Sequence, residues 1–277
     1  MPGVWVLCCG YQARRSPPKG AGTGYNGAMN PSTITPPFRI LYEKGPCICV
    51  QKQAGLLTQA PPGINNLETQ LRDFIKQREE KTGNIYLAII HRLDRPVSGA
   101  IVFCRNVRAA QRLAAQFRER TVHKTYWAIV EGHLDSRAGE WTDYVRKIPD
   151  VAKGEIVEAS AEGAKSASLS YRVLAQSDAH SLLEIELGTG RYHQIRLQCS
   201  ARGFPVLGDM LYGASESFGP KVEDTRHQHI ALHARRLQFR HPMVDEQVDI
   251  TAPLSAAWEE SSIWQQLKQQ LAGEVTS

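Results

Sequence analysis

Short runs of apolar and β-branched residues recur along most of the chain, and only a few helical patterns separate them. Runs of about four to eight such residues, bounded by polar turns, are typical of β-strands. Because the strands outnumber the helices and do not alternate strictly with them, the pattern predicts the α+β class, with a mixed, largely antiparallel central sheet flanked by helices. The expected strands lie within residues 38–55 (two strands around a turn at Gly45-Pro46), 85–90, 100–103, 123–132, 168–174, 181–187, 230–239 and 246–251.

Asparagines mark the starts of two expected helices. Asn66 precedes a helix that should stop at Gly83, and Asn106 opens a second, amphipathic one. The arginines of the second helix lie largely off its apolar stripe and could form either a solvated face or an RNA-facing patch. Its stripe comprises Val107, Ala110, Leu113, Ala114 and Phe117. We also expect a short helix from about Tyr192 to Gly203, a final helix through 258–271, and a hairpin or irregular excursion over 135–166.

Composition narrows the class of protein. No run of about 18 apolar residues occurs, which excludes a membrane-spanning helix. The net charge of +5 gives weak support for a polyanionic partner such as nucleic acid. The six cysteines form no CxxC pair, so we expect free thiols in a cytoplasmic protein that needs no metal and no cofactor.

Residues 1–37 differ from the rest of the chain, since they contain no Asp or Glu and are rich in Pro and Gly. A disordered arm, a transit peptide, and translation that actually begins at Met29 are the alternatives. A transit peptide should be amphipathic and Ser-rich, which this segment is not. We therefore expect 1–37 to be a disordered or spurious extension before one catalytic domain at 38–277.

The segment "HRLDRPVSG", residues 91–99, places charged side chains directly after an apolar strand. Enzymes often present reactive groups in such loops. Asp94 is the candidate for chemistry, although it could simply pair with Arg92 or Arg95 at a strand end.

The segment "LGTGRYHQIRLQ", residues 187–198, is the second dense group of polar residues. Gly188 and Gly190 permit a tight passage from strand to helix. Arg191 and Arg196 would then lie near the helix start, where they could hold a phosphate or a partner carboxylate.

Taken together, these segments resemble the RluA family of pseudouridine synthases. The ordered blocks are "HRLD…SG", "K-x-Y-x-A-I-V-x-G", "GR-x-HQIR", "GFPVLGDMLYG" and "ALHARRLQFRHP", and they span most of residues 38–260. The resemblance implies an RNA isomerase that acts on tRNA or rRNA stem-loops, and we expect a monomer by default. It also implies a stand-alone catalytic domain, because no N-terminal S4 module precedes the blocks.

The resemblance also assigns roles. Asp94 matches the catalytic aspartate, Arg196 the arginine that pairs with it, and Tyr126 the tyrosine that lies against the target base. Arg92 matches a position that can enter the RNA stack when a nucleotide flips out. The other motif residues, expected to contact RNA or to support the site, are Arg95, Lys124, Arg191, His193 and Gln194.

Two positions depart from the family pattern. The usual "KPxG" reads Lys52-Gln53-Ala54-Gly55, and Val97 stands where Thr is usual. Neither touches Asp94, whose part as nucleophile or base stays open. The rival interpretations are a non-catalytic RNA-binding or ribosome-assembly factor on the same fold and, more distantly, a glycosidase, which would need a second carboxylate.

Overall fold

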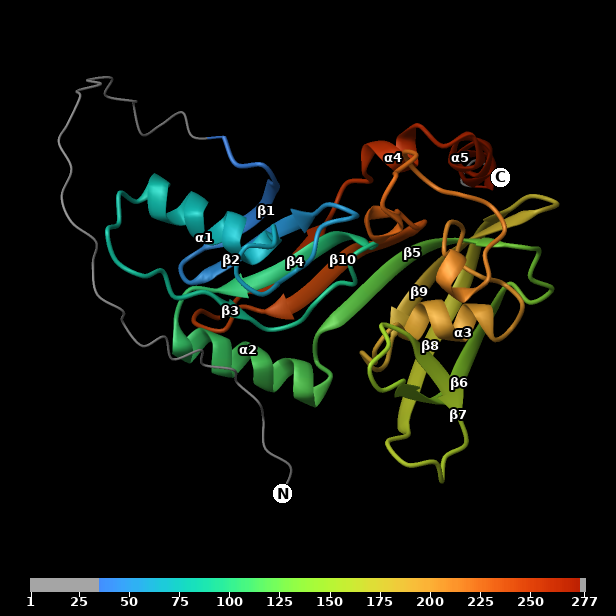
Figure 1. The fold of residues 1–277 in the computed structure, drawn as a ribbon, viewed down its shortest axis with the longest axis horizontal. Coiled ribbons are helices and arrows are strands. Elements are labelled where there is room, and N and C mark those ends of the chain that lie inside the picture. The colour runs from blue at the N-terminus through green and yellow to red at the C-terminus, as the bar shows by residue number, and fades with distance from the viewer. Residues whose placement is uncertain (1–34, 275–277) are drawn as a thin grey trace. The chain divides into compact units, whose positions relative to one another are not determined.

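One mixed sheet of eleven strands organises residues 35–274, which are the residues that the computed structural model describes (Figure 1). The predicted extension at 1–37 lies almost entirely outside them, so it stays a prediction. In chain order the strands are β1 (Arg39–Lys44), β2 (Cys47–Lys52), β3 (Ala88–Ile89), β4 (Ser98–Cys104), β5 (His123–Glu131), β6 (Ala138–Lys147), β7 (Gly154–Val157), β8 (Lys165–Gln176), β9 (His180–Leu187), β10 (Leu232–Arg240) and β11 (Gln247–Thr251).

The strands follow the order β1-β2-β4-β10-β5-β9-β8-β6-β7, with β3 beside β4 and β11 beside β10. β4 and β10 run parallel, whereas the neighbours on either side pair antiparallel. This arrangement confirms the predicted α+β class with a largely antiparallel sheet. β10 therefore joins the N-terminal strands to the β5–β9 half of the sheet.

Helices pack on the sheet and bury their apolar residues there. In Figure 1, α1 lies beside β1 and β2, α2 lies near β3, and α3 lies against β8 and β6. The helices are α1 (Leu67–Arg78), α2 (Val107–Glu119), α3 (Gln194–Ser200), α4 (Ala256–Glu259) and α5 (Ser262–Glu274). No helix among the described residues is long and apolar enough to cross a membrane.

Both capping asparagines are confirmed. The Asn66 side chain accepts a hydrogen bond from the Thr69 amide, and Asn106 caps α2 in the same way. The predicted stop at Gly83 is wrong. Glu80 adopts a left-handed conformation (φ 49°), and Lys81 N–H donates to the Lys76 carbonyl, so the helix closes several residues earlier without a glycine.

Other boundaries also differ from expectation. Only Ala88–Ile89 of the run 85–90 is paired as a strand, and α3 begins at Gln194 and ends at Ser200. The region 135–166 forms the β6–β7 hairpin and the start of β8. The final helix is split into α4 and α5. Val107 is 52% exposed and so lies off the buried face of α2, whose first buried residues are Ala109 and Ala110.

Gly99 brings β4 and β10 together. Its backbone has φ +121°, and an added Cβ would lie 2.3 Å from the Ala234 carbonyl oxygen. No other residue type fits this position without moving a strand. The close approach fixes the first residue pairs of β4 against β10, directly after the loop that carries Asp94.

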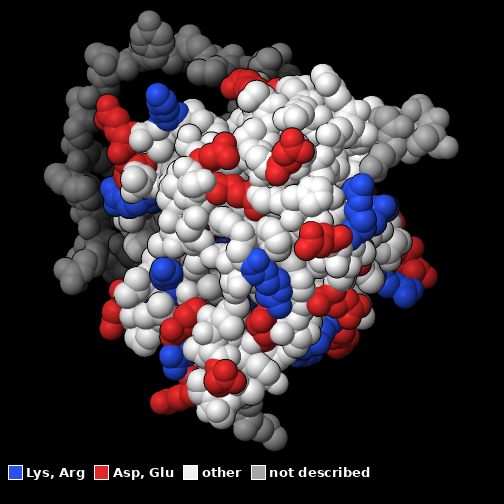
Figure 2. All heavy atoms as spheres, turned by 90° about the vertical axis from the view of Figure 1, so that its right-hand side faces the viewer, with Lys and Arg blue, Asp and Glu red and all other residues white. Residues whose placement is uncertain are grey.

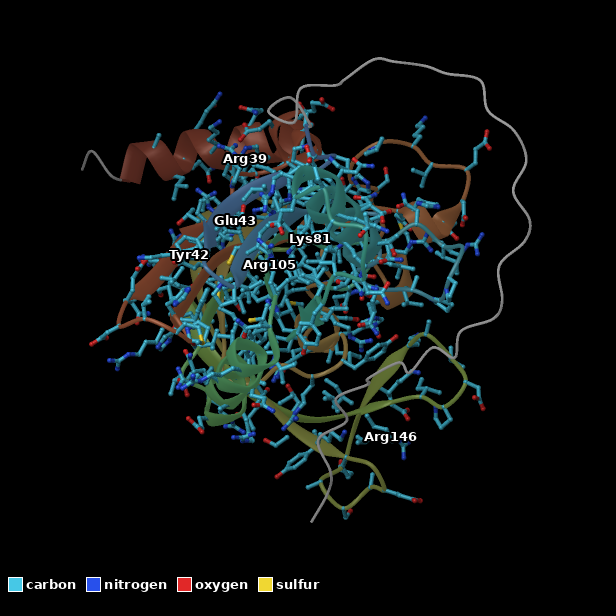
Figure 3. The ribbon with its side chains drawn as sticks, turned by 90° about the vertical axis from the view of Figure 1, so that its left-hand side faces the viewer. Arg39, Tyr42, Glu43, Lys81, Arg105 and Arg146 are labelled. Atoms are coloured by element: carbon cyan, nitrogen blue, oxygen red, sulfur yellow. The ribbon has the colours of Figure 1, made fainter. Side chains whose placement is uncertain are left out.

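An ion-pair cluster fastens α1 to the edge of the sheet. Arg78 and Arg105 both pair with Glu43, and Arg105 also pairs with Glu79. Figure 3 shows Glu43, Lys81 and Arg105 close together in this region. These groups are only partly exposed, so the cluster supports the geometry of β1 and the end of β4 more than isolated surface pairs would.

Candidate active site

The loop between β3 and β4 delivers Asp94 to the base of a cavity. The Val97 N–H donates to the Asp94 carbonyl at 3.1 Å, which turns the chain into β4. At the start of β4, Ser98 Oγ lies 2.8 Å from Nδ1 of the buried His233. The loop is therefore fixed by its own turn at Val97 and by the contact of Ser98 on β4 with His233 on β10.

A second segment, between β9 and α3, reaches the same cavity. The Gly188 N–H donates to the Ser168 carbonyl, and an added Cβ at Gly188 would lie 2.7 Å from Ser168 Oγ. The buried Gln194 amide accepts from Thr189 and from the Arg191 N–H and donates to Ser168 and Gln198. These four hydrogen bonds occupy the amide, so Gln194 shapes the passage into α3, which fits the expectation that it supports the site; a contact with RNA stays a prediction.

Arg196 binds Asp209, and not Asp94, through its two-donor fork. Its Nε and Nη2 donate to the carboxylate of Asp209 at 2.5 and 2.8 Å, and both side chains are almost fully buried. The remaining nitrogen, Nη1, lies 3.7 Å from Asp94 Oδ2. Asp209 thus fixes the guanidinium in the position from which it faces Asp94.

Asp94 itself is 29% exposed, and its ion-pair contacts within residues 35–274 are with Arg196 and His193, each at 3.7 Å from Oδ2. Neither Arg92 nor Arg95 forms an ion pair with it within residues 35–274, so the alternative of a simple strand-end pair is not what the structure contains. Burial raises the pKa of Asp94, while Arg196, Lys52 and Arg92 oppose that rise by favouring the carboxylate.

Lys52 is a fully buried cation near Asp94 that the sequence reasoning did not single out for the site. Its Nζ donates to the carbonyls of Gln53, Leu56 and Arg95. Burial lowers the pKa of Lys52 to about 7, and Asp94 acts in the opposite direction. Three carbonyl acceptors match the three N–H donors of an ammonium, which favours the charged form.

The other predicted residues divide into two groups. Tyr126, on β5, is buried and lines the cavity, where burial and the nearby Asp94 raise its pKa. Arg92 is exposed on the rim of the same cavity, which Lys124 and Arg191 also line. Arg95 is not brought there, because it donates to the Gly55 carbonyl and contacts His227.

The cavity has a volume of about 630 Å³, a size suited to a nucleotide-sized group. Asp94 is the one acidic residue among the described residues that line it, and the lining cations are Arg92, Arg118, Arg120, Lys124, Arg191 and Arg196. Figure 2 shows the right-hand side of the molecule as drawn in Figure 1, where acidic and basic side chains are interspersed. The cavity therefore combines one carboxylate with a strongly basic rim suited to a polyanion.

Sequence reasoning missed Asp209, Tyr212 and Lys52 as parts of the site. Asp209 and Tyr212 belong to the quoted block "GFPVLGDMLYG", so the sequence motif contained both residues although it assigned no role to either of them. Groups of three or more metal-binding side chains do not occur within residues 35–274.

A family model described as RNA pseudouridylate synthase matches residues 46–201, more than half of the chain. Human RNA pseudouridylate synthase domain containing 1 shares the fold, with a TM-score of 0.64 and 24% identity over 86% of this chain and 95% of that one. Human RNA pseudouridylate synthase domain containing 4 has a TM-score of 0.65 at 22% identity, over 84% and 93% of the two chains. The class is therefore that of the pseudouridine synthases, which are isomerases.

Two relatives of similar sequence indicate the family within this class. Ribosomal large subunit pseudouridine synthase D of Xanthomonas campestris is 32% identical over 225 residues, which cover 79% of this chain and 66% of that protein. tRNA pseudouridine synthase C of Haemophilus influenzae is 31% identical over 234 residues, covering 80% and 95%. The chain spans just under two thirds of the first relative's length and nearly all of the second's. The chain belongs to the RluA family of pseudouridine synthases.

Proposed function

We propose that this protein converts specific uridines in tRNA or rRNA stem-loops to pseudouridine, with Asp94 as the catalytic carboxylate. The observation that carries the proposal is the position of Asp94, which faces Arg196 inside a basic cavity. The names of the relatives support the two RNA classes, since one is a large-subunit rRNA enzyme and the other a tRNA enzyme.

The chemistry explains why one paired carboxylate is needed. The C1′–N1 bond of uridine breaks, the base turns, a C1′–C5 bond forms, and the proton lost from C5 is balanced by one gained at N1. No redox step occurs, so we propose no nicotinamide or flavin. Asp94 acts at the sugar, as nucleophile or as base, only when it is ionised, and Arg196 favours that form.

The target base must leave the RNA stack before Asp94 can reach its sugar, which costs a few kcal/mol. Arg92, exposed at the rim, is placed to fill the vacated stack with its guanidinium plane. Tyr126 would lie against the extruded uracil inside the cavity, and Lys124 and Arg191 would bind nearby phosphates.

We also propose that the protein acts as a monomer. Because tRNA and rRNA are the substrates proposed, we also propose that the protein works in the cytoplasm. We propose further that the reaction needs no bound metal.

The test is a pseudouridine map of total RNA from cells with and without the gene. Loss of one or a few sites, restored by wild type and not by Asp94→Asn, would support the activity and identify the substrate together. Asp94→Asn keeps the shape of the side chain, so its unfolding midpoint should stay near that of wild type. An unchanged map combined with tight RNA binding would instead favour the binding-factor alternative.

A further inference from the structure

A chain of close polar contacts runs from the β6–β7 hairpin to the candidate carboxylate. The N–H of Gly154, the first residue of β7, donates to Tyr212 Oη at 2.8 Å. Tyr212 Oη lies 2.8 Å from His193 Nδ1. The other ring nitrogen, His193 Nε2, lies 3.7 Å from Asp94 Oδ2.

The donors in this chain determine where the imidazole proton lies. A backbone N–H can only donate, so Tyr212 Oη accepts from Gly154 and its own proton is free to be donated to His193 Nδ1. A neutral imidazole whose Nδ1 accepts carries its proton on Nε2, the nitrogen that faces Asp94.

The charged groups around His193 favour the neutral ring. Burial and the adjacent Arg196 lower its pKa to about 3, although Asp209 acts in the opposite direction. Asp94 and the phenols of Tyr192 and Tyr212 are the other titratable groups facing it. At neutral pH the ring therefore presents an N–H donor and no positive charge.

The ring is also held mechanically. Tyr192 stacks on it with ring centroids 3.9 Å apart, and Tyr212 meets it edge-on at 5.6 Å. The backbone of His193 is left-handed, with φ 52°, a conformation that costs free energy for most non-glycine residues and occurs at functional sites.

His193 and Arg196 approach the same oxygen of Asp94. Within residues 35–274, the closest contacts of Asp94 with His193 and with Arg196 both fall on Oδ2, so that Oδ2 is the oxygen that these two side chains anchor. Two donors on one oxygen fix the rotation of the carboxylate better than one can. The separations of 3.7 Å are longer than a hydrogen bond, and such contacts commonly tighten when the substrate binds.

We propose that His193 is a positioning residue for Asp94, that Tyr212 fixes its Nε2–H tautomer, and that the docked β6–β7 hairpin holds Tyr212 in place. The proposal rests on the proposed role of Asp94. It adds that the hairpin, which is remote in sequence from Asp94, is coupled to the orientation of the carboxylate.

Two substitutions at His193 test the contacts of its two ring nitrogens one at a time. Asn places its carbonyl oxygen near the position of Nδ1 and tolerates a left-handed backbone, so His193→Asn keeps the contact with Tyr212 and loses the donor toward Asp94. Gln extends its amide to the position of Nε2, so His193→Gln restores a donor there. His180→Asn is the matched control, because His180 is equally buried but pairs with Glu216, and neither of these two residues lines the cavity.

The first experiment uses total RNA from cells that lack the gene, with each enzyme in excess, and follows pseudouridine formation over time. We expect His193→Asn to lower the maximal rate about tenfold or more, the effect of losing a donor to a charged group, with an unchanged half-saturating enzyme concentration. His193→Gln should recover part of that rate, and His180→Asn should match wild type. Equal rates for His193→Asn and wild type, or equal losses for Asn and Gln, would overturn the inference.

Two further measurements test the coupling. A long-range proton–nitrogen NMR spectrum of the full chain should show His193 as the Nε2–H tautomer in wild type, and a mixture of tautomers in Tyr212→Phe. Gly154→Ala places a Cβ 2.9 Å from Leu197 Cδ1 and 3.3 Å from the Arg146 carbonyl oxygen, and we expect this crowding to disturb the contact between the Gly154 N–H and Tyr212. Its rate loss and that of His193→Asn should be less than additive, because both break one chain. Full additivity, or an Nδ1–H tautomer in wild type, would overturn the coupling.

Failure of the proposed function gives a different pattern. In that case wild type would form no pseudouridine in any RNA, or Asp94→Asn would be fully active. If wild type is active and Asp94→Asn is not, the behaviour of His193→Asn tests only the positioning role of His193.

Discussion

The buried pair of Arg196 and Asp209 should separate stability from activity. In Asp209→Leu, the guanidinium loses both hydrogen bonds in a region where the two side chains are 5% and 1% exposed. Removing one partner of a buried ion pair costs about 3–5 kcal/mol of the free energy of unfolding. Because Arg196 keeps Asp94 at 3.7 Å, we expect a loss near the lower end, about 3 kcal/mol.

The double variant Arg196→Met with Asp209→Leu removes both charges and fills the space with apolar side chains. Such replacements are often neutral or stabilising, and the Met sulfur can pack on Tyr212, whose ring now lies 4.8 Å from the guanidinium carbon. We therefore expect the double variant to recover at least about 2 kcal/mol of the loss. It should nevertheless stay inactive, because Asp94 loses the guanidinium that lies 3.7 Å from its Oδ2.

Urea unfolding of the single and double variants measures the stability, and the time course of pseudouridine formation measures the activity. The control is Asp249→Leu, which breaks a two-donor pair with Arg236 on the surface and should cost less than about 1 kcal/mol. A double variant no more stable than Asp209→Leu would refute the stability argument. A double variant with wild-type activity would refute the role of Arg196 at Asp94.

Three further predictions concern pH, the sheet and RNA binding. The maximal rate should rise with pH as Asp94 ionises. Arg196 lowers the pKa of Asp94, and Arg196→Lys loses the fork to Asp209, so this variant should be slower and its rate should rise at higher pH. An identical pH profile for the variant and wild type would contradict this prediction. Gly99→Ala should lower the free energy of unfolding by about 2–4 kcal/mol, because Gly99 has a φ of +121° and an added Cβ would lie 2.3 Å from Ala234. The control Gly213→Ala has open space around it and should lose no more than about 1–2 kcal/mol, with both variants measured by urea unfolding. Arg191→Ala should weaken RNA binding and reduce the slope of log affinity against log salt by about 1 in filter-binding titrations, and an unchanged slope would remove Arg191 from the phosphate contacts.

Local signals in the sequence predicted the elements well. Asn66 and Asn106 cap their helices because a cap depends only on neighbouring backbone amides. The helix end at Glu80 escaped prediction because the residue adopts a left-handed conformation without being a glycine. The break between α4 and α5 likewise carries no glycine or proline signal in the sequence.

The candidate site was predicted as a set of residues but not as a set of contacts. The motifs led to Asp94, Tyr126 and Arg196, and all three line one cavity. The choice of Asp209 as partner for Arg196 depends on how the segment after α3 folds back, and that is a tertiary contact without a local pattern. Arg95 lies one residue from Asp94 yet faces away, because neighbouring side chains in an extended loop point in different directions.

The position of β10 has a consequence for synthesis on the ribosome. β4, which follows the Asp94 loop, and β5, which carries Tyr126, each pair with β10 and not with one another. At about 5–20 residues per second, the ribosome needs on the order of ten seconds after Tyr126 to reach Arg240. From the end of β9 until β10 is made, the nascent chain holds both halves of the sheet without the strand that joins them. The enzyme therefore gains its active geometry only late in translation, and a nascent chain stalled before β10 should expose two unpaired strand edges for which chaperones would compete.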